Sequence, residues 1–220
     1  MSAKKLLSDI IELDSKIADL RDAFDECEAG DQKRALAEVF DRELKAIGGE
    51  DPVSIALVRA ADMAIPLGAG GAELLARALS HGNPDVRSVA GESLLGIAED
   101  DFAAIRPAVD YALGAGCPAA EELPFVLAMT DDGDTAKTIA EFLKCKDPDA
   151  VAASIEALAD FGDPSSIPAL RALLEDKRVV TVEGEDEGEG EGKGKAEGLQ
   201  TWTIGDLAGE AIEMIEEEEE

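Results

Sequence analysis

The sequence predicts an all-α protein, an α-solenoid of about five helical hairpins stacked side by side. Three observations predict this fold class. Apolar residues recur at helical spacing through most of the 220 residues, a cap-plus-proline pair returns at nearly constant intervals, and two distant stretches align position by position. A single hairpin cannot bury both of its apolar faces, so it needs copies beside it.

The clearest hairpin spans residues 72–98, where two apolar helical faces flank a short turn. Gly82 is expected to end the first helix in a left-handed conformation, which glycine adopts without steric cost. Asn83 is expected to be the N-cap of the second helix, with Pro84 as its first residue. Leu94 lies in the middle of the second apolar face and is therefore a predicted core residue.

The same junction recurs along the chain. Cap-plus-proline pairs occur at Asp51-Pro52, Asn83-Pro84, Cys117-Pro118 and Asp147-Pro148, so the intervals are 32, 34 and 30 residues. An equivalent fifth turn is expected at Arg178, where an acidic, glycine-rich insertion begins instead. Residues 204–215 then align with 86–97, which predicts that the fifth hairpin keeps both helices. Pro107 and Pro124 fall inside expected helices and predict kinks or late starts there.

Three parts are predicted: an N-terminal capping helix over residues 1–30, a repeat array over 31–215 and an acidic tail over 216–220. The tail is a run of glutamates at a helix C-terminus. Negative charge is unfavourable at that end of the helix dipole, so the tail is expected to fray.

The N-terminal helix, expected over residues 4–28, carries a heptad seam. Its apolar residues recur at alternating steps of four and three: Leu6, Ile10, Leu13, Ile17, Leu20 and Phe24. The seam can cover the open end of the first repeat, as a solenoid requires, or it can form a short coiled coil between two chains. We favour the capping helix and a monomer, with a dimer through residues 4–28 as the alternative.

The insertion, residues 179–203, has β-prone ends around an acidic, glycine-rich centre. It predicts a two-stranded ribbon that leans on the helices, with Trp202 as its anchor. The acidic tip, which includes Glu185, Asp186 and Glu187, is either a recognition arm for a basic partner or a solvated loop expansion.

Charge and composition exclude several classes of function. Lys and Arg number 20 against 50 Asp and Glu, which gives a net charge of −30. This field repels nucleic acids and anionic membranes but is compatible with a basic protein partner. Three scattered cysteines, no visible signal peptide and no apolar run long enough to span a membrane together predict a cytoplasmic protein.

No pattern in the sequence predicts catalysis. The one histidine, His81, lies in a turn between helices and is expected at the surface, and Cys117 is a thiol at another turn. Residues 68–71 are glycine-rich but lack the rest of a phosphate-binding loop, and residues 130–134 lack the ligand spacing of a calcium loop. We therefore expect no enzyme activity, no cofactor, no catalytic residues and no metal site.

The repeats resemble HEAT-like repeats, in particular the short type named after phycobilisome lyases. The resemblance rests on N-P-D-V-R-x-x-A-x-x-x-L at 83–94, D-P-D-A-V-x-x-S-I-x-A-L at 147–158 and D-P-S-S-I-P-A-L-R-A-L-L at 163–174. It implies a superhelix whose second helices line a concave surface. The family consists mostly of scaffolds and adaptors, with a few bilin lyases and glycosylases of alkylated DNA, and the charge of −30 opposes the last activity.

The sequence thus predicts a non-catalytic scaffold or adaptor that binds a protein partner, a basic one, through its concave helical face and its acidic insertion. The alternative is a lyase or ligand-binding protein of the phycobilin-lyase type. The partner-binding residues expected on the second helices and on the ribbon are Arg59, Arg87, Glu92, Glu122, Glu156, Glu210 and Trp202, together with the three acidic tip residues named above.

Overall fold

The computed structural model describes residues 3–114, 118–183 and 199–218 of the protein. A separate helix, α1 (Ala3–Asp25), comes first. The helical hairpins in the described ranges are α2 (Ala29–Ala46) with α3 (Ile55–Ala64), α4 (Ala69–Leu79) with α5 (Pro84–Asp100), α6 (Arg106–Ala112) with α7 (Leu123–Ala128), α8 (Thr135–Ile139) with α9 (Pro148–Phe161), and α10 (Ile167–Arg171) with α11 (Ile204–Glu218).

Short 3-10 helices extend or precede several of these helices: η1 (Ile65–Leu67), η2 (Phe102–Ile105), η3 (Pro118–Ala120), η4 (Phe142–Lys144) and η5 (Pro164–Ser166). Two strands, β1 (Val179–Glu183) and β2 (Leu199–Thr203), lie between α10 and α11.

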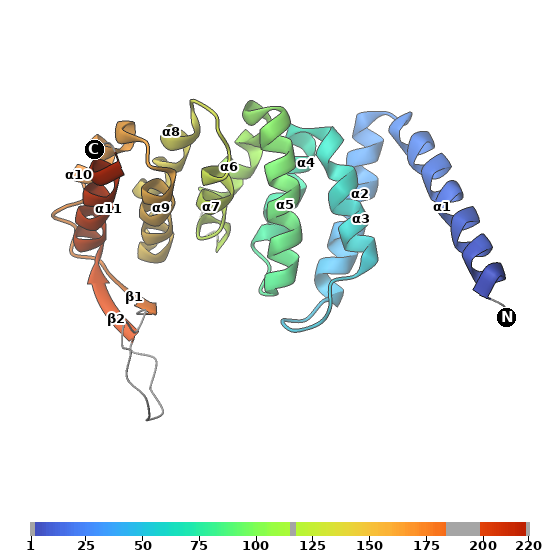
Figure 1. The fold of residues 1–220 in the computed structure, drawn as a ribbon, viewed down its shortest axis with the longest axis horizontal. Coiled ribbons are helices and arrows are strands. Elements are labelled where there is room, and N and C mark those ends of the chain that lie inside the picture. Colours follow the sequence, from blue (N-terminus) through green and yellow to red (C-terminus); the bar gives the residue numbers. More distant parts are fainter. Residues whose placement is uncertain (1–2, 115–117, 184–198, 219–220) are drawn as a thin grey trace, which may run out of the picture.

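The hairpins stand side by side in an elongated row (Figure 1). Each second helix contacts the next second helix, from α3 through α5, α7 and α9 to α11. Among the first helices, α2 contacts α4 and α4 contacts α6. The apolar core lies between these two layers and consists mainly of Ala, Leu, Ile and Val. The helical repeat architecture predicted from the sequence is therefore present.

The junction between α4 and α5 is built around Asn83, whose side-chain oxygen accepts hydrogen bonds from the backbone of Asp85 at 2.9 Å and of Val86 at 3.2 Å. Asn83 is thus the predicted N-cap, and Pro84 is the first residue of α5. The prediction for Gly82 is wrong. Among the described glycines only Gly68 and Gly162 have positive φ, and α4 already ends at Leu79 because Ser80 leaves the helix.

The other predicted turns differ in how they begin the second helix. Asp147 is the N-cap of α9, and its side chain accepts from the backbone of Asp149 at 3.1 Å. Asp51 does not begin α3, because its carboxylate instead accepts from the Gly48 backbone at 2.8 Å inside the loop. Ser54 caps α3 three residues later. Cys117 lies outside the described residues.

The prolines inside the third hairpin delay the helices. Pro107 and Pro124 both lie in the first two positions of their helices, α6 and α7. An N–H in the first helical turn has no partner within the helix, so a proline is tolerated there. Both helices are short as a result, and each is preceded by a 3-10 helix.

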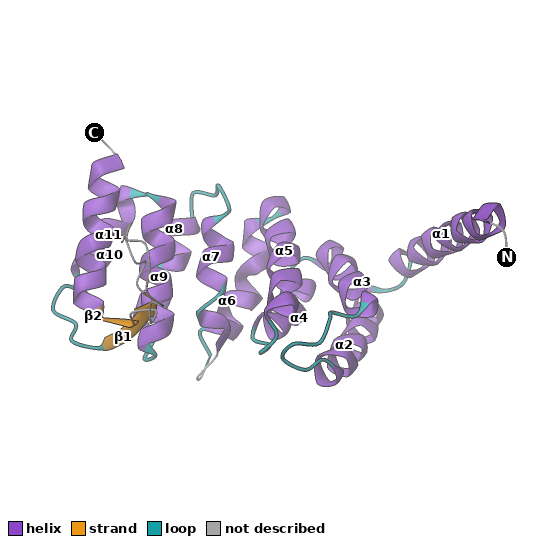
Figure 2. Cartoon of the chain, turned by 60° about the horizontal axis from the view of Figure 1, so that its bottom comes forward, coloured by secondary structure: helices purple, strands orange, loops and turns teal. Residues whose placement is uncertain are grey.

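The two strands form the predicted antiparallel ribbon, with Val180 opposite Trp202. The ribbon contacts α9 through β1 and α11 through β2 (Figure 2). Val180 is buried, and Trp202 is half-buried against the apolar core, so both attach the ribbon to the helices. The acidic centre of the insertion, residues 184–198, lies outside the described residues.

Helix α11 continues into the acidic tail as far as Glu218. The expectation that the tail frays from residue 216 is therefore wrong for its first three residues. One reason is an ion pair between Arg171 on α10 and Glu216, at 3.0 Å, which offsets part of the unfavourable charge at this helix end. Residues 219 and 220 lie outside the described residues.

Helix α1 does not cover the first repeat, contrary to the expected capping helix. Figure 1 shows it as a separate rod that points away from the array. Its seam residues Leu13, Ile17 and Leu20 are 57%, 47% and 70% exposed. Phe24, at the end of the seam, packs against the core. The buried Gln32 side chain donates a hydrogen bond to the Phe24 carbonyl at 2.7 Å, which fixes the junction of α1 with α2.

A polar clamp joins the first two repeats. The Asn83 side chain is 1% exposed and donates from Nδ2 to the carbonyls of Gly48 at 2.9 Å and Asp51 at 2.8 Å. His81 accepts from the Asn83 backbone at Nδ1, so its Nε2 carries the hydrogen that is donated to the Leu44 carbonyl at 3.1 Å. The half-buried His81 therefore holds two repeats together instead of lying free at the surface.

The burial of Leu94 generates a test of the repeat register. Because its side chain is fully buried between the two layers, Leu94→Ala is expected to lower the free energy of unfolding by about 2–5 kcal/mol. Ile55→Ala, at a side chain that is 79% exposed, is the control, with an expected change within about 0.5 kcal/mol. Urea unfolding followed by circular dichroism measures both. A loss below about 1 kcal/mol for Leu94→Ala would contradict the core assignment.

The clamp predicts that Asn83 does more than cap its helix. Asn83→Asp keeps the acceptor for α5 but removes the donor to the loop carbonyls, so it is expected to cost about 1–3 kcal/mol in urea unfolding. Asp147→Asn makes the reverse change at the N-cap of α9, where the side chain acts as an acceptor and does not donate to a neighbouring loop. Its expected cost is below about 0.5 kcal/mol. Equal effects of the two substitutions would show that the hydrogen bonds to Gly48 and Asp51 contribute no net stability.

Candidate protein-interaction face

Three adjoining grooves run along the layer of second helices. The α5–α7 groove has a volume of about 480 Å³. The α7–α9 groove, which also includes two residues of β1, has about 370 Å³, and the α9–α11 groove has about 340 Å³. Glu122 and Phe125 line both of the first two, and Ala152 and Glu156 line both of the last two. The three are therefore one continuous surface, named here the second-helix groove.

The floor of the second-helix groove is largely apolar. Phe125 and Val126 of α7 and Leu207 of α11 are half-buried and pack against the core from the groove side. Met129 lines the α5–α7 groove and Met214 the α9–α11 groove, and they are 69% and 51% exposed. Methionine side chains adapt their shape to what they contact, so they suit a surface that receives an apolar side chain.

Carboxylates form the rim of the groove. The acidic residues that line the α7–α9 and α9–α11 grooves are Glu121, Glu122, Asp149, Glu156, Asp160 and Glu210, and these linings contain no Lys or Arg among the described residues. Arg87 lies in the α5–α7 groove, where its Nε donates to Glu122 at 2.6 Å and its Nη1 to the His81 carbonyl at 3.1 Å. Arg87 therefore neutralises Glu122 alone, and the other five carboxylates have no basic residue beside them in these linings.

Two of the rim carboxyls respond to this environment. Burial raises the pKa of Glu121, and the nearby carboxylates of Asp147, Asp149 and Glu122 raise it further. Burial also raises the pKa of Glu156, with a smaller contribution from Asp160. A cation bound beside Glu121 and Glu156 would lower both pKa values again, because it stabilises the ionised carboxylates that burial and like charges disfavour.

The residues predicted from the sequence fall into three groups. Arg87, Glu92, Glu122, Glu156 and Glu210 all line the second-helix groove. Arg59 is exposed on α3, outside the groove linings, and Trp202 lies in β2 against the core. The acidic tip residues Glu185, Asp186 and Glu187 lie outside the described residues.

Sequence reasoning missed several groove residues. Asp160 and Met214 follow Glu156 and Glu210 by four positions, the spacing that places two side chains on one helix face, so this signal was available. Phe125 could not be found in this way, because the late start of α7 sets its orientation.

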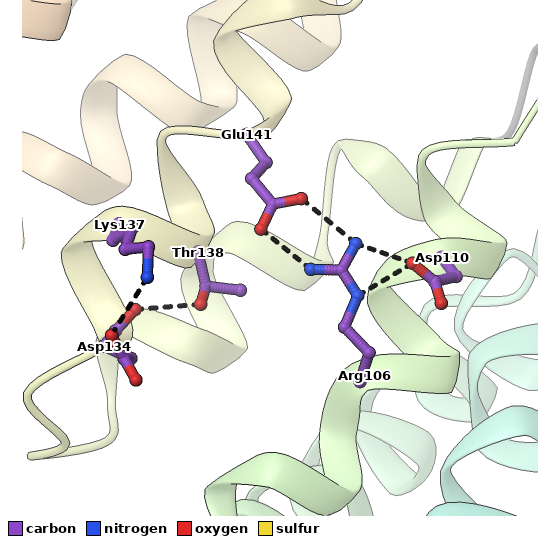
Figure 3. A network of polar contacts seen from close by, with 6 residues as sticks. All are labelled: Arg106, Asp110, Asp134, Lys137, Thr138 and Glu141. Carbon is purple, nitrogen blue, oxygen red and sulfur yellow. Dashed lines mark hydrogen bonds and ion pairs between the residues drawn. The ribbon is translucent and has the colours of Figure 1, made fainter.

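The opposite layer contains ion pairs within and between repeats. Arg106 of α6 donates two hydrogen bonds to Asp110, at 2.8 and 2.6 Å, and two to Glu141, at 2.8 and 3.0 Å (Figure 3). These carboxylates raise the pKa of Arg106 further above its already high value. Lys137 lies 3.5 Å from Asp134 beside this network. Each of these carboxylates thus has a basic partner, whereas in the second-helix groove Arg87 pairs with Glu122 alone.

Groups with the chemistry of a metal or nucleophilic site are spread apart. No three His, Cys, Asp or Glu residues among the described ones are arranged to hold a metal ion. Burial raises the pKa of the Cys145 thiol, with a smaller contribution from Asp147, which favours the unreactive form. In the described ranges, no helix combines the length and the apolar character needed to cross a membrane.

The fold and this face define a helical repeat protein with an extended acidic groove. Comparison with known families supports a HEAT-like repeat protein, because a family model of HEAT repeats matches residues 119–183. No curated protein matches the chain. A solved crystal structure, described as that of an engineered protein, shares 17% identity over 90% of this chain and 97% of that chain, with a TM-score of 0.34.

The raised pKa of Glu156 predicts a pH-dependent effect on stability. A folded-state pKa above the unfolded value of about 4.5 means that ionised Glu156 destabilises the fold, fully above the raised pKa and less as the pH falls toward 4.5. Glu156→Gln is therefore expected to raise the melting temperature at about pH 7 and to lose this advantage toward pH 4.5.

The matched control is Glu38→Gln, which removes the same charge from an exposed position on α2 outside the groove. Thermal unfolding of the three proteins at a series of pH values measures the difference. An equal gain in Glu38→Gln would show that the gain comes from net charge and not from the groove.

Proposed function

We propose that this protein is a non-catalytic scaffold or adaptor that binds a basic protein segment in the second-helix groove. The observation that carries the proposal is the continuous apolar floor with a rim of six carboxylates and no basic residue in two of its three linings among the described residues. HEAT repeats suggest a fold of the protein-interaction scaffold kind.

The chemistry of the groove defines the kind of partner. Apolar side chains of the partner would lie on Phe125 and between the methionines, where burial of apolar surface provides affinity. Lys or Arg side chains on both sides of that apolar stripe would reach the acidic rim. Complementary charges provide specificity and speed association. An amphipathic basic helix combines both features.

Two further predictions from the sequence belong to this proposal. The acidic insertion, residues 179–203, adds negative charge through its centre, residues 184–198, and would act as a second contact for the same basic partner. The protein would act in the cytoplasm, through a concave surface formed by the second helices. The alternative, a lyase or ligand-binding protein of the phycobilin-lyase type, rests on the resemblance of the repeat motifs alone.

The proposal is tested with a fluorescent synthetic helix whose apolar stripe of leucines is flanked by lysines. The groove variant Glu156→Lys with Glu210→Lys is compared with Glu38→Lys with Glu50→Lys, which has the same net charge but changes exposed residues of the first repeat. Anisotropy titrations are expected to show at least about tenfold weaker binding for the groove variant and a change within about twofold for the control.

Equal weakening in both variants would contradict the proposal, since it would show that the peptide responds to overall charge and not to the groove. The same proteins, with a fourth chain that lacks residues 184–198, then serve as bait in native lysate at low and moderate salt. A basic protein that binds the wild type and the control but not the groove variant is the expected partner. Its loss from the fourth chain alone would assign recognition to the insertion instead.

A further inference from the structure

Helix α1 presents an apolar stripe with no partner among the described residues. Leu13, Ile17 and Leu20 are 57%, 47% and 70% exposed and follow one another at spacings of four and three. Three large apolar side chains in a row on a free helix are unusual at a protein surface and mark an interaction site. The heptad of the sequence extends the stripe toward the N-terminus through Ile10 and Leu6.

The stripe has the residue pattern of a two-stranded coiled coil. In the heptad, isoleucine occupies the a positions 10 and 17, and leucine occupies the d positions 6, 13 and 20. Phe24 is the next a position, but it packs against the core of its own chain and is held there by Gln32. The part of the helix left for a partner is therefore the stretch before Phe24.

We propose that α1 pairs with α1 of a second copy as an antiparallel two-helix coiled coil. In the proposed register, Ala3, Ile10 and Ile17 of one copy lie opposite Leu20, Leu13 and Leu6 of the other, in that order. By symmetry this gives six apolar layers, and none of them requires Phe24. That register also places Lys16 opposite position 9 of the second copy, which is an aspartate, on both sides of the pair.

Charge favours this orientation over the parallel one. A parallel pair would place Lys16 beside Arg21 of the second copy, and Asp9 beside Asp14 of the second copy. Both are contacts between like charges. The segment Ala3–Asp25 holds four basic and six acidic residues, so it carries −2 and leaves −28 on the rest of the chain. An antiparallel pair keeps the two acidic arrays at opposite ends of a helix that is about 35 Å long, well beyond the screening length.

Sedimentation equilibrium of the full chain over a wide range of concentrations is the first test. The expected result is a reversible dimer with twice the mass of the 23.0 kDa chain. Ile17→Asp is expected to raise the dissociation constant at least about tenfold. Ala18→Asp introduces the same charge on the outward face of the same helix and is expected to change it less than about twofold.

Charge reversal tests the orientation. Lys16→Glu is expected to weaken the antiparallel dimer, and Asp9→Lys added to Lys16→Glu is expected to restore it, since the pair is then reversed and not lost. In a parallel dimer Lys16→Glu would instead strengthen association, because it would face Arg21, and that result would overturn the proposal. Circular dichroism of each variant checks that α1 stays helical, since Lys16 also forms an ion pair with Glu12 at 2.7 Å.

A single-chain mass at every concentration would also overturn the proposal, as would a dimer that survives Ile17→Asp. The main competitor is α1 folded back over Ile55 and Val58, the exposed apolar residues of α3. That arrangement predicts a monomer, and Ile17→Asp would lower its melting temperature. The dimer proposal predicts instead that Ile17→Asp and the wild type have the same melting temperature at concentrations where the wild type is monomeric.

Discussion

The whole fold depends on the fact that no hairpin can bury its apolar faces alone. Each pair of helices is covered by the pair on either side, and so the junctions between repeats must have a fixed geometry. Asn83 shows how this is achieved: one buried amide begins α5 with its oxygen and holds the loop of the preceding repeat with its nitrogen. The cap of one helix is thereby also the link to its neighbour.

Arginines continue this role along the array. Arg87 joins the turn of the second repeat to Glu122 of the third, Arg106 joins the third repeat to Glu141 of the fourth, and Arg178 joins the fifth to the Cys145 carbonyl of the fourth at 2.8 Å. These links join neighbouring repeats, and the depressions between the second helices of those repeats share lining residues and so form one groove. In the groove itself few basic residues remain to neutralise the rim.

Features determined by local sequence could be predicted, and features determined by contacts between repeats could not. The N-caps Asn83 and Asp147 and the ribbon that contains Trp202 all follow from a few adjacent residues. The start of α3 at Ile55 and the direction of α1 depend on the loop at Asp51 and on the hydrogen bond from Gln32 to Phe24, which join residues brought together by folding. One acid per second helix could be placed on the groove from helical spacing, but the apolar floor could not.

The ribbon between α10 and α11 has a consequence for how this architecture can change. At that position the shorter connection of the other hairpins is replaced by two strands and the segment between them, and yet α11 still packs on α9 as its predecessors pack on one another. The closure of a hairpin is thus decoupled from the stacking of its helices. Inter-helix turns of such an array are natural acceptor sites for grafted peptides or whole domains, through which a lineage or a designer can add a new specificity while the stack stays intact.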